Sequence, residues 1–210
     1  MQKTQKILFC PDEQLYTIEE LEERLSFKFL PRITFETIEM REEVRKRGLE
    51  KFENKGVSEE SLALGALYIK KIETGYLPKV SIRQMHQDIG HGLFAEEDIV
   101  KGDYVGEYTG IVRKNDRRYT EPLNHYCYEY PVPDPIGRSF VIDATSGHLT
   151  RFINHSYEPN LQPTHVFYEG YYHLIFIAIA NIKKGTQFSY NYGKNYWYIR
   201  RSPMNLYFND

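Results

Sequence analysis

Hydrophobic and polar positions follow a helical period in the first third of the chain. Thr17 and Glu20 form the capping-box pattern that starts a helix, and an apolar periodic segment follows them. Residues 41–55 carry opposite charges four positions apart, which is typical of a solvent-exposed helix face. Ser58 precedes a third segment whose leucines form an apolar stripe. The pattern predicts an α-helical region over residues 1–76.

From about residue 77 the pattern changes to short β-branched and aromatic runs separated by Gly, Pro, Asn and Asp. The runs are GLFA, YVGEYTGIV, HYCYEYPV, SFVID, HLIFIAIANI and TQFSYNY. Short strands with little helix between them indicate a mostly antiparallel β domain. The last stretch is aromatic and basic and too short to fold alone, so we expect it to pack back on this domain. The predicted organisation is a helical region at 1–76, a β domain at 77–195 and a closing tail at 196–210.

Composition and charge exclude several classes of protein. Lys and Arg number 27 against 29 Asp and Glu, so the chain lacks the basic excess of a protein that coats nucleic acid, while a basic partner would suit it. Two cysteines, Cys10 and Cys127, cannot build a disulfide framework or a cysteine-based zinc cluster. No apolar run reaches the roughly 18 residues of a membrane span, and the N-terminus lacks a signal-peptide pattern. We therefore expect a soluble protein of a reducing compartment.

Glycines and tyrosines are the residues that could carry chemistry. Gly90 and Gly92 flank His91 at the start of a predicted strand, where a backbone could approach a ligand closely, although such a pair is more often a turn. The chain contains 18 tyrosines, which indicate either β-rich packing or a pocket built of phenols. The tyrosines that could converge are Tyr108, Tyr128, Tyr190 and Tyr192. The sequence contains neither a GxSxG nucleophile elbow nor an HExxH metal motif.

Five segments match one family in order and spacing. They are GHGLF, EYTG, FVIDA, RFINHSYEPN and IANIKKGTQFSYNYG. Together they resemble the SET domain of protein lysine methyltransferases over roughly residues 78–195, and GEYTGI with YGKNYW is most similar to the short SET proteins of chlamydia-type bacteria. The resemblance implies a mostly β SET fold, with small antiparallel sheets and a C-terminal pseudo-knot, preceded by the α-helical region.

The resemblance also implies that S-adenosyl-L-methionine is the cofactor and lysine the acceptor. The residues implied to hold the cofactor are Gly90, His91, Gly92, Leu93, Arg151, Phe152, Asn154, His155 and Trp197. Tyr192 and Tyr108 are implied as catalytic residues, and Tyr128 and Tyr190 as further walls of the lysine channel. At the position of Tyr190 the family has phenylalanine or tyrosine, and the resemblance implies that a tyrosine there favours low methylation states, because its hydroxyl can hold a water beside the amine.

Tyr157 is a departure from the family pattern. Many members have a zinc-binding cysteine at this place, and the chain has no cysteine after Cys127. We therefore expect no metal site, and we expect the aromatic residues Tyr196, Trp197 and Tyr198 to close the cofactor pocket in place of a zinc-bound lid.

The channel chemistry follows from elementary electrostatics. A free lysine has a pKa of about 10.4, so at neutral pH its ammonium group has no lone pair for attack. An apolar aromatic channel and a neighbouring sulfonium both lower that pKa. Positioning of the amine can lower the barrier by about 7–11 kcal/mol. Because a phenol is a weak base, we expect Tyr192 to orient the reacting groups rather than remove a proton.

The resemblance therefore predicts a lysine N-methyltransferase that acts on histone or histone-like basic proteins, a chromatin regulator or bacterial effector. Two alternatives stay open: a catalytically inactive SET-fold interaction module, and a methyltransferase of a ribosomal or other non-histone protein. We expect a basic protein partner, no direct nucleic acid and no membrane, with substrate or homodimer contacts open for residues 1–76. The expected location is the bacterial cytoplasm, with secretion into a host cell and action in its nucleus left open.

Overall fold

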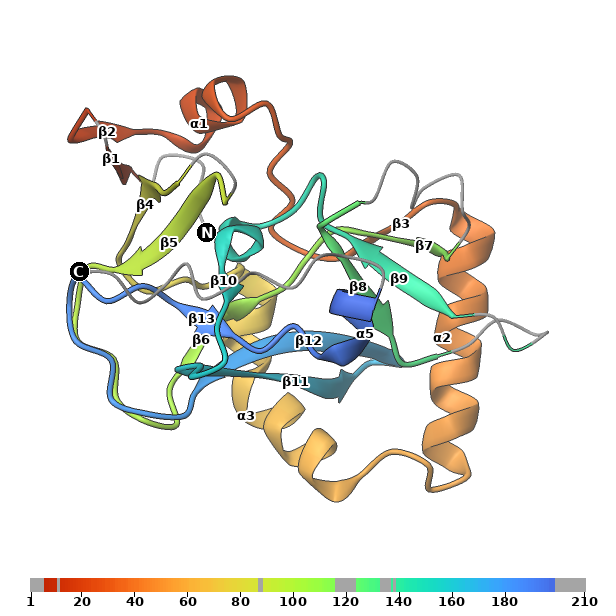
Figure 1. Ribbon diagram of the computed structural model, residues 1–210. Helices are drawn as coiled ribbons and strands as arrows, with labels where there is room; N and C mark the ends of the chain where they lie inside the picture. Colours follow the sequence, from red (N-terminus) through yellow and green to blue (C-terminus); the bar gives the residue numbers. More distant parts are fainter. Residues whose placement is uncertain are drawn as a thin grey trace.

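The computed structural model describes residues 6–10, 12–86, 89–115, 124–132, 137 and 139–198. Its strands form four small sheets, and the sheets share a hydrophobic core to which buried residues of each contribute (Figure 1). Small sheets with few helices are the predicted SET-type architecture. None of the described helices is long and apolar enough to cross a membrane.

The first sheet joins the start of the chain to the glycine motif. Its strands, in spatial order, are β2 (Gln14–Tyr16), β1 (Ile7–Cys10), β4 (Val80–Gln84) and β5 (His91–Ala95). β1 pairs parallel with β4, and β4 pairs antiparallel with β5. Ile7 and Phe9 are buried while their neighbours are only half-buried, which is the two-residue period of a strand. The sequence analysis did not predict β1 and β2, which lie within the region expected to be helical.

Two further sheets carry the expected β runs. One has the order β3 (Thr34–Phe35), β7 (Ile111–Lys114), β9 (Phe140–Asp143) and β8 (Cys127–Tyr130), so that β8 is an edge strand. The other has the order β11 (Leu161–Tyr168), β12 (Tyr171–Ala178) and β6 (Tyr104–Glu107).

β11 and β12 form a long hairpin that the run pattern revealed only in part. Glu169 and Gly170 connect the strands with φ values of 50° and 89°, as a tight two-residue hairpin turn requires. β11 was not predicted. It contains Pro163, which lacks a backbone N–H and is tolerated because β11 lies at the edge of its sheet.

The fourth sheet is a short parallel pair that joins the Asn-His motif to the tyrosine-rich C-terminal segment. β10 (Asn154–His155) pairs with β13 (Ser189–Tyr190), and the Ser156 N–H extends the pairing by donating to the Tyr190 carbonyl at 3.1 Å. A single turn of 3₁₀-helix, η1 (Leu149–Phe152), leads into β10. Two motifs that are distant in sequence are thereby held side by side.

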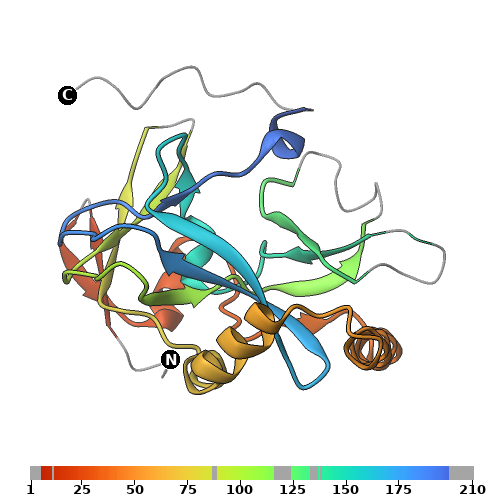
Figure 2. The ribbon, with the colours of Figure 1, turned by 90° about the horizontal axis from the view of Figure 1, so that it is seen from below.

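Three helices occupy the N-terminal region: α1 (Ile18–Arg24), α2 (Ile38–Glu53) and α3 (Glu59–Thr74). The predicted capping box is confirmed, since the Thr17 side chain accepts from the Glu20 N–H and the Glu20 carboxylate accepts from the Thr17 N–H. Ser58 caps α3 as predicted, by accepting from the Ser61 N–H. Seen from below, α3 lies against the β11–β12 hairpin and α2 is viewed end-on beside it (Figure 2).

Two glycines, one in α2 and one in α3, allow these helices to lie close to the β11–β12 hairpin. A Cβ added at Gly48 would meet the Gly170 carbonyl, and one added at Gly65 would meet the Phe167 carbonyl, in both cases closer than a real Cβ approaches. Glycine inside a helix costs about 1 kcal/mol relative to alanine. Here the small residue lets the helix backbone lie directly on the hairpin.

The C-terminal segment ends the described chain with α5 (Lys194–Tyr198), which lies near β8 and β9 (Figure 1). Residues 199–210, the remainder of the expected closing tail, lie outside the described residues. The expected division of the chain at residues 76 and 195 stays a prediction. The first boundary does not separate the sheets, since β1 and β3 each pair with a strand that lies beyond residue 76.

Candidate functional site

The structure brings the four singled-out tyrosines into one cluster. Tyr108 follows β6, Tyr128 lies on β8, Tyr190 lies on β13 and Tyr192 follows it. The ring centroids lie 4.6 Å apart for Tyr190 and Tyr192, 6.3 Å for Tyr128 and Tyr190, and 5.9 Å for Tyr108 and Tyr128. Phe176 of β12 packs behind them, 5.0 Å from Tyr190. The cluster therefore has polar phenol tips on an apolar support.

The hydroxyls of two of these tyrosines are held by main-chain carbonyls. Tyr192 donates to the Ile153 carbonyl at 2.8 Å, and Tyr108 donates to the Tyr126 carbonyl at 2.7 Å. Burial raises the pKa of Tyr108 and of Tyr190 well above 10, with a smaller contribution from Tyr192. These two phenols are therefore neutral at physiological pH, and they can orient a partner without acting as anions.

A cavity of about 470 Å³ opens beside the cluster. Tyr128, Tyr190 and Tyr192 line it, together with Glu129 from β8 and Lys194 from the start of α5. The cavity is thus a groove between the β8–β9 edge and α5, and its volume is in the range of ligand sites, roughly 300–1,000 Å³.

Tyr196 attaches α5 to the other wall of this groove. Its hydroxyl lies 3.0 Å from Nδ1 of His125, which precedes β8, and its ring packs edge-on against Tyr192 at 4.7 Å. The C-terminal segment therefore contributes one wall of the groove, and its closure of the cofactor pocket stays a prediction.

The glycine motif lies at the start of β5. Gly90 has a φ of +77°, a conformation that favours glycine. A Cβ at Gly92 would lie 2.7 Å from Nε2 of Gln187, so the glycine lets the Gln187 side chain approach the backbone of β5 closely. Asn154 donates from Nδ2 to the His91 carbonyl at 3.1 Å. The Leu93 side chain is fully buried, and its carbonyl accepts from the Phe188 N–H at 2.9 Å.

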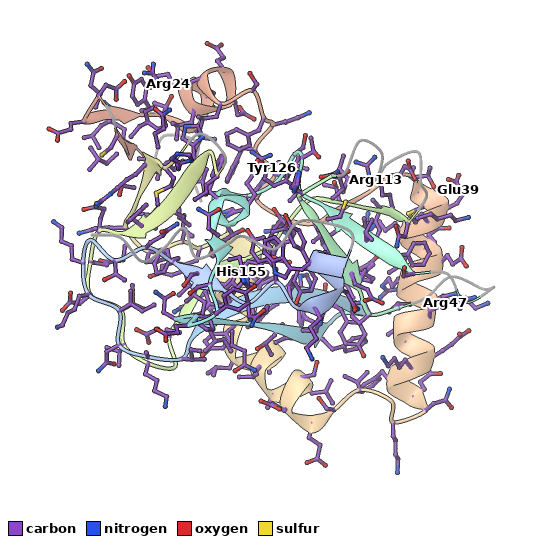
Figure 3. The ribbon with its side chains drawn as sticks, viewed as in Figure 1. Arg24, Glu39, Arg47, Arg113, Tyr126 and His155 are labelled. Carbon is purple, nitrogen blue, oxygen red and sulfur yellow. The ribbon has the colours of Figure 1, made fainter. Side chains whose placement is uncertain are left out.

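His155 lies where the Asn154–His155 motif meets the tyrosine cluster, in the central part of the molecule (Figure 3). Its Nδ1 accepts the Tyr192 N–H at 3.1 Å, which requires the neutral ring, and burial lowers its pKa accordingly. Tyr157 and Trp197 pack edge-on against the imidazole, with centroids at 4.6 and 4.9 Å. Trp197 and Tyr157, the residue that replaces the family's cysteine, therefore pack against the same histidine.

Arg151 packs among aromatic rings and bonds to the main chain. Its guanidinium lies 3.8 Å from the Tyr126 ring centroid and 5.0 Å from that of Phe152, and Nε donates to the Ala144 carbonyl at 2.6 Å. Because the Tyr126 carbonyl also receives the Tyr108 hydroxyl, Arg151 supports the wall of the tyrosine cluster. Its implied role toward the cofactor stays a prediction, as does that of Phe152.

The residues present fit the implied cofactor. Nine buried side-chain polar atoms have no hydrogen-bond partner within the described parts of the chain, and three of them belong to this region: Nε2 of His155, Nε2 of Gln187 and Nε1 of Trp197. Buried polar groups are normally satisfied, so these atoms are suited to a bound molecule. Gly92, which has no side chain, lies beside one of them, Nε2 of Gln187. A ligand with polar groups at both ends, such as S-adenosyl-L-methionine, matches this set.

Sequence reasoning missed Asn160, the last residue of RFINHSYEPN. Its Nδ2 donates to the Gln187 carbonyl at 2.7 Å and its Oδ1 accepts the Ser189 N–H at 2.9 Å, so its side chain holds the segment that enters β13. The motif itself was the available signal. Tyr126 and Gln187 carried no local signal, because their roles depend on partners distant in sequence.

Comparison with known proteins agrees with this geometry. Residues 90–193 match the family described as SET domain. Histone-lysine N-methyltransferase EZH2 of Chaetomium thermophilum is 35% identical over 116 residues, which are 51% of this chain and 8% of that protein. N-lysine methyltransferase KMT5A-A of Danio rerio is 33% identical over 112 residues, which are 50% of this chain and 32% of that protein.

Among solved structures, an active polycomb repressive complex 2 in the basal state matches with a TM-score of 0.51 and 30% identity, over 60% of this chain and 16% of that chain. The match is confined to a part of each relative, since this chain spans 8% and 32% of the two curated relatives named above. The fold, the tyrosine cluster and the sequence match coincide in the same segment. Residues 90–193 therefore form a SET domain.

Proposed function

We propose that this chain is an S-adenosyl-L-methionine-dependent protein lysine N-methyltransferase whose substrates are basic proteins of the histone or histone-like class. The observation that carries the proposal is the cluster of Tyr108, Tyr128, Tyr190 and Tyr192 beside an open groove. The names of the relatives support it, since one is a histone-lysine and the other an N-lysine methyltransferase.

The groove provides what a lysine side chain needs before it reacts. Its aromatic walls disfavour the charged ammonium, so they lower the pKa of the amine, and the released proton passes to solvent through the open groove. The bound cofactor would supply a methyl group activated by an adjacent sulfonium. Tyr192, whose hydroxyl is held by Ile153, would orient the amine with its lone pair toward that methyl group.

Three residues would determine the position of the cofactor and the methylation state of the product. His155 and Asn154 lie on β10, beside β13, so the cofactor segment and the tyrosines are parts of one rigid pairing. Tyr190 lines the groove. Its hydroxyl would hold a water next to the amine and so favour low methylation states. Membership of the chlamydia-type subgroup, a homodimer and a bacterial or host-nuclear location remain parts of the proposal.

The test is incubation of the purified protein with radiolabelled S-adenosyl-L-methionine and a panel of core histones, a bacterial histone-like protein and ribosomal proteins. We expect a labelled histone or histone-like band that Tyr192→Phe reduces by a factor on the order of 100, as for the loss of one positioned hydroxyl. Tyr76→Phe, which changes a partly exposed tyrosine outside the groove, is the matched control and should leave the label intact.

Calorimetry with the cofactor separates the remaining outcomes. Cofactor binding that survives Tyr192→Phe agrees with a role in orientation. Absence of both label and cofactor binding in the wild type would contradict the proposal and favour a SET-fold interaction module, and label on ribosomal proteins alone would replace the histone class with a non-histone substrate.

A further inference from the structure

The rim of the groove carries opposite charges on its two walls. Glu129 lies on β8 and Lys194 begins α5, and both are exposed and line the cavity. Neither forms an ion pair with another residue in the described part of the chain, whereas exposed pairs such as Lys183 with Asp98 do occur elsewhere. Both charges are therefore available to a bound molecule.

The other polar groups at the rim do not alter this separation of opposite charges between the two walls. Asn115, Asn124 and Asn195 contribute neutral carboxamides to the lining. On the neighbouring strands, Arg113 and Asp143 neutralise each other in an ion pair of 2.6 Å that is largely buried. His125 is engaged with Tyr196 across the groove. Among the described residues that line the groove, the fixed charges are thus one carboxylate on the β8 wall and one ammonium on the α5 wall.

The position of Glu129 relates it directly to the acceptor lysine. Tyr128, a wall of the tyrosine cluster, is its neighbour on β8, and one residue of a strand advances by about 3.3 Å. An extended substrate segment advances by the same distance per residue. Successive side chains of β8 point to opposite faces, so Glu129 borders the groove from the face of this edge strand opposite to Tyr128. A substrate segment whose lysine points between Tyr128 and Tyr192 would therefore bring a residue one or two positions away past Glu129 as it crosses the edge of β8.

We propose that Glu129 and Lys194 make this groove selective for the charges that flank the acceptor lysine. The groove accepts a cationic residue on the β8 side and a neutral or anionic residue on the α5 side. The inference rests on the proposed methyltransferase function and narrows its substrate class: the preferred segment is basic on one flank of the lysine, rather than uniformly basic.

The experiment uses short peptides with one central lysine and neutral flanks, in which arginine or glutamate is placed singly at each of the two positions on either side. Peptide affinity is measured by fluorescence anisotropy and methyl transfer by kcat/KM. We expect arginine to be preferred over glutamate by a factor of about 3–10 at one flanking position, since each exposed pair contributes modestly. The preference should diminish as salt is raised.

Variants assign the preference to its residues. Glu129→Gln should abolish it, Glu129→Lys should reverse it, and Lys194→Glu should create a preference for arginine on the opposite flank. Glu23→Gln, an exposed carboxylate on α1 outside the groove lining, is the control and should leave the pattern unchanged.

The readouts distinguish failure of the inference from failure of the proposed function. Wild-type methyl transfer whose flank preference survives Glu129→Gln and Glu129→Lys overturns the charge selectivity and leaves the enzyme intact. Peptide binding with the predicted charge pattern but without transfer supports the selectivity and contradicts the enzymatic proposal. Failure of the wild type to bind or methylate any of the peptides overturns both.

Discussion

His148 makes the stability of this fold sensitive to acid. The residue precedes η1, its side chain is fully buried, and its ring packs against Phe29 with centroids 5.1 Å apart. Burial lowers the pKa of the imidazole from 6.5 to about 3, and the Gly75 backbone offsets part of that shift. The folded protein therefore holds a neutral histidine at a pH where the unfolded chain binds a proton.

The sign and size of the effect follow from these two pKa values. Because the folded pKa is the lower one, the contribution of His148 to stability is complete above pH 6.5 and is lost as the pH falls toward 3. At pH 5 the loss amounts to about 2 kcal/mol, from 1.36 kcal/mol per pKa unit. Burial also lowers the pKa of His165, to about 4, which adds a further loss of about 2 kcal/mol at the same pH.

The assay is urea unfolding followed by circular dichroism at pH 7.5 and pH 5. The wild type should lose about 4 kcal/mol of unfolding free energy from these two histidines, and His148→Phe or His148→Leu should lose about half of that. The comparison uses the change with pH, so a variant that is less stable at both values is still informative. His86→Gln, at an exposed site, is the control. Equal losses in the wild type and both His148 variants would refute the reasoning.

Three further changes test the site and its support. Tyr190→Phe should raise the methylation state, because it removes the hydroxyl that would hold a water beside the amine; an unchanged product distribution by mass spectrometry would contradict that role. Gly65→Ala should lower the unfolding free energy by about 1–3 kcal/mol, because the methyl group meets the backbone of β11, whereas Ala66→Gly on the exposed face should cost only about 1 kcal/mol. Arg151→Lys should destabilise by about 1–2 kcal/mol in urea unfolding, because an ammonium cannot stack on Tyr126 as a planar guanidinium does; an unchanged midpoint would contradict the structural role.

Local rules in the sequence account for much of the fold. Thr17, Glu20 and Ser58 marked helix starts because a cap depends on neighbours a few positions away. The strands β5, β8 and β9 follow the predicted runs of apolar and aromatic residues. β1 and β3 escaped prediction because a strand of a few residues has too little periodicity and is stabilised by distant partners.

The candidate site also has features that the sequence predicted and features that it did not. Motif order was enough to single out the tyrosines that the structure gathers, and to place Asn154 and His155 beside them. It did not indicate that Arg151 would stack on Tyr126, because that contact depends on how the segment before β8 packs against η1. The charge pattern of the groove was equally hidden, since Glu129 and Lys194 are far apart in sequence and unremarkable in isolation.

The short parallel pairing of β10 with β13 has a consequence for the order in which the molecule assembles. Each strand contributes only two residues, and the chain between them includes the whole β11–β12 hairpin. The entropy of closing so long a loop must be met before the few contacts of the pairing are gained, whereas the hairpin forms from neighbouring residues. We therefore expect the hairpin to form first and the tyrosine cluster to be completed late, so that in pulsed hydrogen exchange during refolding the amides of β11 and β12 gain protection before those of β13.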